Sequence, residues 1–355
     1  MKSKITISIL SLVIIFSLSC SKDSVFTPID KRAENIGEIK LQLEELYTNA
    51  IFPINQDLLK EIALLKTNAT LLSTSNTLQQ LEKVQTNWTT LAITWRKAEL
   101  FNVGPINNSF IHYKINRWPI DKDEIDTYIE TETSILDDFT ISIGSSSKGI
   151  TSLEYLLFES SFSFDANDDN KIAYINSVIF ELENNFNNLN SAWESYREEF
   201  ISSTEIGITG SQNRIHNTIS SLVEKIIITK LGKAIENIEN TPNDYLEAGI
   251  SENSLEFIKT NFEIIEYCFS ESAGFNSYLT KIDETELVTK INNALSECEL
   301  KLNDFSESFK TSLAKKETGK MENLQESFNS LLAIIKIDMA ATLGNTITIS
   351  DNDGD

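Results

Sequence analysis

The segment that begins at Gly149 holds the side chains best suited to chemistry in this chain. Thr151 and Glu154 lie three residues apart, so a helix would present both on the same face. A hydroxyl beside a carboxylate suits a hard cation or a hydrogen-bonded polar ligand better than it suits zinc. We therefore predict a ligand site at Gly149, Thr151 and Glu154, with Glu154 as the candidate ligand of a divalent or ferric cation.

Each of these residues also has a purely structural explanation. A carboxylate early in a helix, as at Glu154, is stabilised by the helix dipole. Thr151 could stabilise the first helical turn, and Gly149 could form the turn before it. The residue types alone leave both interpretations open.

Zinc-dependent hydrolysis is the chemistry that this composition supports least. A catalytic zinc normally takes three protein ligands, commonly histidine and carboxylate, and keeps one position open for water. The chain has two histidines, His112 and His216. We expect His112 to be a packed or solvated loop residue and His216 to be exposed on a polar helix. This favours a binding protein over a metallopeptidase.

Arg117 and Trp118 are the other candidate ligand-binding pair. They could clamp a ligand, or Trp118 and the proline after it could anchor a loop on the core. The acidic run at 165–170 begins like an EF-hand loop but lacks its glycine and its final glutamate, so we expect a solvated turn. No glycine-rich phosphate loop, nucleophile elbow or Cys-x-x-Cys motif is present.

The N-terminus predicts export and lipid anchoring. Two lysines precede an apolar run at 5–18, and Cys20 follows the small residues that end it. We interpret residues 1–19 as a lipoprotein signal peptide, Cys20 as the acylated residue and residues 20–33 as a flexible tether. The alternative is an ordinary secretory signal with a chance cysteine. Lipidation would place the protein in the cell envelope, in the periplasm or at the outer membrane.

The charge of the chain limits its partners. The formal net charge is −23, which argues against nucleic acid and against anionic lipid as partners of the protein surface. Membrane contact should therefore occur only through the N-terminal lipid. The two remaining cysteines, Cys268 and Cys298, fall on apolar helix seams, where we expect unpaired core residues rather than a disulfide.

Apolar residues recur at helical spacing throughout the body, and only 5 prolines and 12 glycines interrupt the chain. We predict an all-α protein of two packed helical-bundle domains, 34–201 and 202–345, followed by an acidic tail at 346–355. The predicted helices are 34–50 and 56–72 on either side of Pro53, 77–101, 122–131, 150–159, 171–200, 211–229, 252–270, 284–314 and 320–343.

Several segments together resemble the imelysin-like family. The family's central motif reads Gly-x-His-x-x-Glu followed by an aromatic and aliphatic run, and here Thr151 stands at the histidine position. Further segments are similar to family patterns in the expected order: 95–105, 115–120, 230–232, 251–255 and 274–279.

The resemblance implies a two-domain, all-helical envelope protein, with Glu99 and Glu154 near a site at the domain interface. Members of the family are associated with iron uptake, and the founding member was described as a peptidase. We therefore expect a non-enzymatic binding component in iron or other metal acquisition, with a small ligand or metal ion and an envelope transport partner. The alternatives are a divergent metallopeptidase and a structural envelope protein without a ligand site.

Overall fold

All the regular structure in the described part of the chain is helical, which confirms the all-α prediction. The computed structural model describes residues 34–348 except 133, 160, 240–244 and 273. The predicted signal peptide, Cys20, the tether and most of the acidic tail lie outside the described residues. No helix among the described residues is long and apolar enough to cross a membrane.

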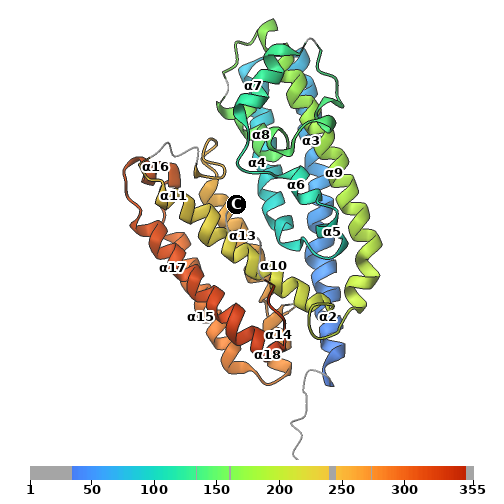
Figure 1. Ribbon diagram of the computed structural model, residues 1–355, viewed down its shortest axis with the longest axis vertical. Helices are drawn as coiled ribbons and strands as arrows, with labels where there is room; N and C mark the ends of the chain where they lie inside the picture. Colours follow the sequence, from blue (N-terminus) through green and yellow to red (C-terminus); the bar gives the residue numbers. More distant parts are fainter. Residues whose placement is uncertain (1–33, 133, 160, 240–244, 273, 349–355) are drawn as a thin grey trace, which may run out of the picture.

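Three long helical rods form the first half (Figure 1). The central one, α3, packs against both α4 and α9. The seam predicted for α4 is buried, from Leu81 through Trp88 to Trp95, because these residues recur every three or four positions. The rods comprise α2 (Ile36–Leu46), the π-helical turn η1 (Tyr47–Ile51) and α3 (Phe52–Thr74); α4 (Leu78–Ala98) with η2 (Glu99–Phe101); and α9 (Asp169–Ser202).

The predicted break at Pro53 is wrong. The chain stays helical from Ile36 to Thr74, and Pro53 lies in the first turn of α3. Proline lacks an N–H and crowds the carbonyl four residues earlier, at Asn49. Asn49 lies within the π-helical turn Tyr47–Ile51, whose altered hydrogen-bond pattern accommodates the proline without a loop.

Short helices lie along the long ones: α7 and α8 are near their upper end and α5 and α6 lie farther down (Figure 1), and α8 carries the central motif. The helix predicted at 122–131 is confirmed as α7, and the Asp121 side chain caps it by accepting a hydrogen bond from the Glu124 N–H. The elements are α5 (Pro105–Asn108), α6 (Ile111–Ile115), α7 (Lys122–Thr131), η3 (Phe139–Ser142), η4 (Ser145–Ser147), α8 (Ile150–Glu154), η5 (Tyr155–Glu159) and η6 (Ala166–Asp168).

The second half is built around α15 packed on α17. The prediction of a single helix at 284–314 is wrong, because one helix ends at Asn303 and a second helix begins at Phe309. The Ser308 side chain caps the new helix by accepting from the Thr311 N–H. The elements are α10 (Ser211–Lys225), η7 (Ile226–Gly232), α11 (Lys233–Glu236), α13 (Ser254–Cys268), α14 (Phe275–Lys281), α15 (Thr285–Asn303), α16 (Phe309–Ala314), α17 (Gly319–Ala333), η8 (Ile334–Met339) and α18 (Ala340–Leu343).

The two halves lie side by side and share one hydrophobic core (Figure 1). Helix α13 of the second half packs on α4, and α10 packs on η2. The buried apolar side chains of both halves belong to a single continuous cluster. The boundary at 202 therefore stays a prediction. Cys268 and Cys298 are buried within this core as free thiols.

Candidate functional site

Glu154 is a buried carboxyl group at the end of α8. Only 3% of the residue is exposed, and its Oε1 accepts hydrogen bonds from both the N–H and the hydroxyl of Ser251, each at 2.8 Å. Burial raises the pKa of Glu154 to about 7, although the Ser251 hydrogen bonds oppose the shift. Helix α8 and the Ser251 segment come from different halves of the chain, so tertiary contact creates this environment.

A pocket of about 420 Å³ opens beside Glu154. Its lining combines polar and apolar side chains from both halves: Trp118, Pro119, Ile120, Asp121, Lys122, Asp123, Ser146, Thr151, Glu154, Leu246 and Ile250. Pockets that join residues from packed units are common ligand sites.

Gly149 allows the motif to approach the preceding loop closely. Its φ is +90°, and a Cβ atom there would lie 2.5 Å from the Ile115 carbonyl oxygen. Thr151, two residues later, is 4% exposed, and its hydroxyl donates to the Arg117 carbonyl at 2.7 Å. Gly149 and Thr151 thus hold α8 against the 115–118 segment.

Arg117 and Trp118 have different surroundings. The Arg117 side chain is exposed, outside the pocket lining, and its guanidinium lies 5.7 Å from the Tyr113 ring centroid. Its contribution to the site is the backbone carbonyl that holds Thr151. Trp118 lines the pocket, and Lys233 Nζ lies 5.8 Å from the centroid of the indole.

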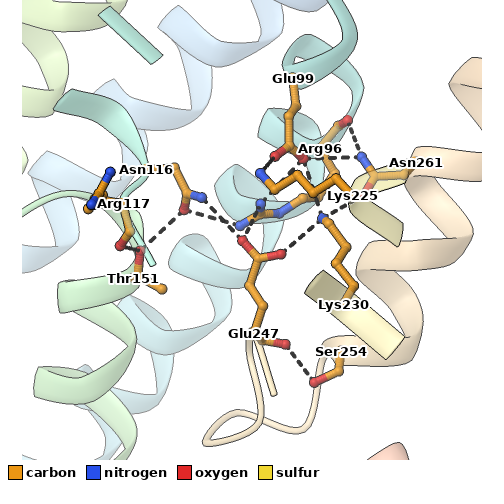
Figure 2. Close-up of polar contacts among 10 residues, drawn as sticks. All are labelled: Arg96, Glu99, Asn116, Arg117, Thr151, Lys225, Lys230, Glu247, Ser254 and Asn261. Atoms are coloured by element: carbon orange, nitrogen blue, oxygen red, sulfur yellow. Dashed lines mark hydrogen bonds and ion pairs between the residues drawn. The ribbon is translucent and has the colours of Figure 1, made fainter. Parts of the chain in front are cut away.

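A buried ion cluster lies behind the pocket, where the halves meet (Figure 2). Arg96 Nη1 pairs with Glu247 Oε1 at 2.8 Å, and Lys230 Nζ pairs with Glu247 Oε2 at 2.9 Å. Glu99 forms ion pairs with Lys225, with Lys230 at 3.4 Å and with Arg96 at 3.5 Å. Three basic groups therefore surround two carboxylates, which leaves the cluster with one net positive charge.

The cluster controls the ionisation of both acids. Burial acts to raise the pKa of Glu99, but the charges of Lys225, Lys230 and Arg96 outweigh it and hold the pKa well below its usual value. Burial likewise opposes the charge of Glu247, but the same three cations lower the pKa of this carboxyl to about 2. Both carboxylates are ionised at neutral pH and are already paired.

Asn116 connects the cluster to the pocket. Its Oδ1 accepts from Arg96 Nη2 at 3.2 Å and from the Thr151 hydroxyl at 3.3 Å, while its Nδ2 donates to Glu247 Oε1 at 3.2 Å. Glu99 lies in the cluster and is absent from the pocket lining. Glu99 and Glu154 thus occupy neighbouring polar environments with different charge balance.

Sequence reasoning missed four of the cluster's members: Arg96, Lys225, Lys230 and Glu247. Lys225 and Lys230 are five residues apart, a spacing that a regular α-helix does not bring together. Lys225 ends α10, and Lys230 lies within the π-helical turn η7, whose i→i+5 pattern suits this spacing. Glu247 lies in the segment before α13, where no helical pattern signals burial. We find no signal in the sequence that could have placed it.

The histidines have other roles. The His112 ring packs 4.7 Å from the Trp95 ring, and burial lowers the pKa of His112 to about 3. The expectation that His216 is exposed is wrong: the residue is fully buried, Nε2–H donates to the Ile335 carbonyl, and Nδ1 accepts from Asn345, each at 2.9 Å. Among the described residues, no three His, Cys, Asp or Glu side chains converge closely enough to hold a metal ion.

Comparisons with known proteins agree with this fold. A family model described as Imelysin (Peptidase_M75) matches residues 51–336. An imelysin-like protein from Psychrobacter arcticum 273-4 is 19% identical, with a TM-score of 0.77, and the match covers 88% of this chain and 98% of that one. A protein from Parabacteroides distasonis ATCC 8503, described as an iron-regulated protein A precursor, is 15% identical with a TM-score of 0.72, over 86% and 95% of the chains. No curated protein matches the chain.

Proposed function

Since this chain belongs to the imelysin family, we propose that it is a non-enzymatic binding component of the cell envelope that acts in the acquisition of iron or another metal. One observation carries the proposal. Glu154 lines a pocket of about 420 Å³, whereas the neighbouring carboxylates of Glu99 and Glu247 are already paired with the cationic side chains of Lys225 and Arg96. Glu154 is thus the buried acid of this region that is available to a ligand.

The donor set suits an ion that brings ligands of its own. Glu154 and Thr151 offer one carboxylate and one hydroxyl, and the pocket volume far exceeds that of a bare cation. A hydrated or chelated divalent or ferric ion would donate hydrogen bonds from its own ligands to these oxygens. Asp121 and Asp123 in the pocket lining favour positive charge there, and the one cation in the described lining, Lys122, is paired with Glu159.

A divergent metallopeptidase fits the same residues less well. That chemistry needs a water activated by a metal held at about 2 Å by several protein ligands. Thr151 stands where the family motif has histidine, and both histidines of the chain are engaged elsewhere, His112 with Trp95 and His216 with Ile335 and Asn345. A purely structural envelope protein would need no pocket at this interface.

Attachment to the membrane completes the proposal. A lipid on Cys20 and a tether at 20–33 would hold the helical body near a membrane surface, where a transport partner could receive the cargo. The described body has no membrane-spanning helix of its own.

Titration with metal ions tests this function. Anaerobic calorimetry with Fe²⁺, and separately with Mn²⁺, should give saturable binding of about one equivalent to the purified protein. Glu154→Ala should weaken binding about tenfold or more, because hydrogen bonds to a charged group contribute roughly 1.5–3 kcal/mol. Mass spectrometry should find the same metal in protein purified without added chelator.

Glu198→Ala is the matched control, because this α9 carboxylate is 84% exposed and lies outside the pocket lining. It should bind metal as the unmodified protein does. Equal loss in both variants would refute a site at Glu154. Peptide cleavage that disappears on chelation and in Glu154→Gln would establish the peptidase instead.

A further inference from the structure

The two oxygen atoms of the Glu154 carboxyl group have different surroundings. Ser251 donates both its N–H and its hydroxyl to Oε1, each at 2.8 Å. The other oxygen, Oε2, accepts no hydrogen bond from the described residues, yet it is not sealed from water. The residue as a whole is only 3% exposed and lines the pocket of about 420 Å³. Oε2 is therefore the oxygen that Glu154 can offer to a ligand in this pocket.

Thr151 adds a second hydrogen-bond acceptor to the pocket. Its hydroxyl proton is directed to the Arg117 carbonyl oxygen at 2.7 Å (Figure 2). The lone pairs of the hydroxyl oxygen can still accept a hydrogen bond. Asp121 and Asp123 add carboxylates to the lining, and the ammonium group of Lys122 is engaged in an ion pair. The described lining thus offers mainly acceptors to a ligand.

These acceptors do not form a coordination shell. Divalent ions such as Mg²⁺ and Mn²⁺ take about six oxygen ligands. Among the described residues, no three acidic, histidine or cysteine side chains converge on one point, and Glu154 has one open oxygen. Six water molecules occupy about 180 Å³, at roughly 30 Å³ each, so the pocket has room for an ion that keeps its water.

Building on the function proposed above, we propose that the pocket binds a divalent cation in its fully hydrated, octahedral form. Water ligands of the ion donate hydrogen bonds to Glu154 Oε2 and to the Thr151 hydroxyl oxygen, and no protein atom enters the coordination shell. The pocket then recognises the charge and size of the hydrated ion. Affinity should not rise from Mn²⁺ to Ni²⁺, as it does at sites of direct coordination.

Hexaamminecobalt(III) is the probe for this mode of binding, because its six ammonia ligands do not exchange and it can bind only through hydrogen bonds and charge. The purified protein is titrated with Mn²⁺ at pH 8, above the Glu154 pKa of about 7, and the electron paramagnetic resonance signal reports free Mn²⁺. Salt at 0.15 M screens the acidic surface beyond about 8 Å. We expect about one saturable site, from which hexaamminecobalt displaces Mn²⁺.

Two further measurements locate the complex and test its selectivity. The ammine protons of hexaamminecobalt should give nuclear Overhauser effects to Thr151 and Trp118, which both line the pocket. Ni²⁺ should bind within about threefold of Mn²⁺. Glu154→Gln should weaken the binding of Mn²⁺ and of hexaamminecobalt about tenfold, because the open oxygen loses its charge. Circular dichroism verifies that the variant is folded.

Glu198→Gln is the matched control, because it makes the same change in net charge on an exposed side chain outside the pocket lining. It should weaken neither cation. Mn²⁺ that hexaamminecobalt cannot displace, or a Ni²⁺ affinity tenfold or more above that of Mn²⁺, would reveal direct coordination and overturn the inference, while metal binding itself would stand. Equal losses in the two glutamine variants, or binding that does not saturate, would overturn both the inference and the function proposed above.

Discussion

Arg96 shows how much of this site depends on a single buried side chain. The residue is fully buried, contacts Glu247 and Glu99, and its guanidinium carbon lies 4.3 Å from the Phe257 ring centroid. A buried ion pair contributes little net stability when intact, because desolvation offsets much of the Coulomb attraction. Removing Arg96 is different, since it leaves buried oxygen atoms without the hydrogen bonds that its guanidinium donates.

We predict that Arg96→Met lowers the free energy of unfolding by about 1.5–3 kcal/mol, because Glu247 and Asn116 would lose their hydrogen bonds to the guanidinium while Lys230 still pairs with Glu247. Urea unfolding followed by circular dichroism measures the change. Lys66→Met is the control, because it breaks the more exposed Lys66–Glu183 pair and should cost about 1 kcal/mol or less. Similar losses of unfolding free energy in the two variants would show that disrupting the buried cluster destabilises the protein no more than disrupting an exposed ion pair.

The raised pKa of Glu154 predicts that the stability of the protein depends on pH. Its pKa is about 7 in the folded protein against an ordinary value of 4.5, so the folded state holds this proton more tightly than the unfolded state. The contribution of this protonated carboxyl group to the free energy of unfolding is fully present below pH 4.5 and is lost as the pH rises through 7. Ionisation of Glu154 should cost on the order of 3 kcal/mol by pH 8.

Glu154→Gln removes this ionisation while keeping an oxygen that accepts from Ser251. The variant should gain stability over the unmodified protein as the pH rises from 5 to 8. Chemical unfolding at several pH values measures the difference between the two curves. Parallel curves would mean that Glu154 titrates near its ordinary pKa.

At the scale of elements, the polar groups of the site are positioned by π-helical turns, where the chain departs from the regular α-helix. Lys225 is the last residue of α10, Lys230 lies within the π-helical turn η7 that follows, and both lysines reach Glu99. Another π-helical turn, η5, follows α8 directly after Glu154. π-helical turns are rare and are frequent at functional sites.

The start of α8 depends on glycine. We predict that Gly149→Ala destabilises the protein by at least about 2 kcal/mol, because φ of +90° is strained for alanine and its Cβ would meet the Ile115 carbonyl at 2.5 Å. Thermal unfolding provides the measurement. Gly319→Ala, at a position with nothing within 4 Å, should change stability by about 0.5 kcal/mol or less. Equal stability of both variants would contradict the close approach at Gly149.

At the scale of the whole molecule, the halves are joined by the same residues that form the site. Arg96 and Glu99 come from the first half, and Lys225, Lys230 and Glu247 come from the second. Ser251 of the second half holds Glu154 of the first. Any shift of one half against the other would therefore change the pocket and the charge balance behind it.

Anchoring is a prediction for the intact chain. Cys20→Ala should move the protein from the membrane fraction to the soluble fraction, because the lipid predicted on Cys20 would be its attachment to the membrane. Fractionation followed by immunoblotting measures the distribution. A Ser21→Ala variant, next to the cysteine, should remain in the membrane fraction. Unchanged membrane partition of Cys20→Ala would refute lipidation at this residue.

The amino-acid sequence by itself determined the helical architecture and the position of the motif. Apolar spacing located α9 to within two residues at each end, because a helix on a protein core buries one continuous face. The motif residues and the ordered family segments indicated the family that the comparisons show. The histidine-to-threonine change at Thr151 was likewise evident from the residues alone.

Only the tertiary structure decided the environment of those residues. His216 looked polar and exposed in the sequence, but contacts with Ile335 and Asn345 satisfy both ring nitrogens within the core. Glu247 and Arg96 are 151 residues apart and become partners only when the halves pack. Burial and charge pairing are long-range properties, whereas spacing along a helix is local. For that reason the sequence located Glu154 on a helix face, and the fold set its pKa and its pocket.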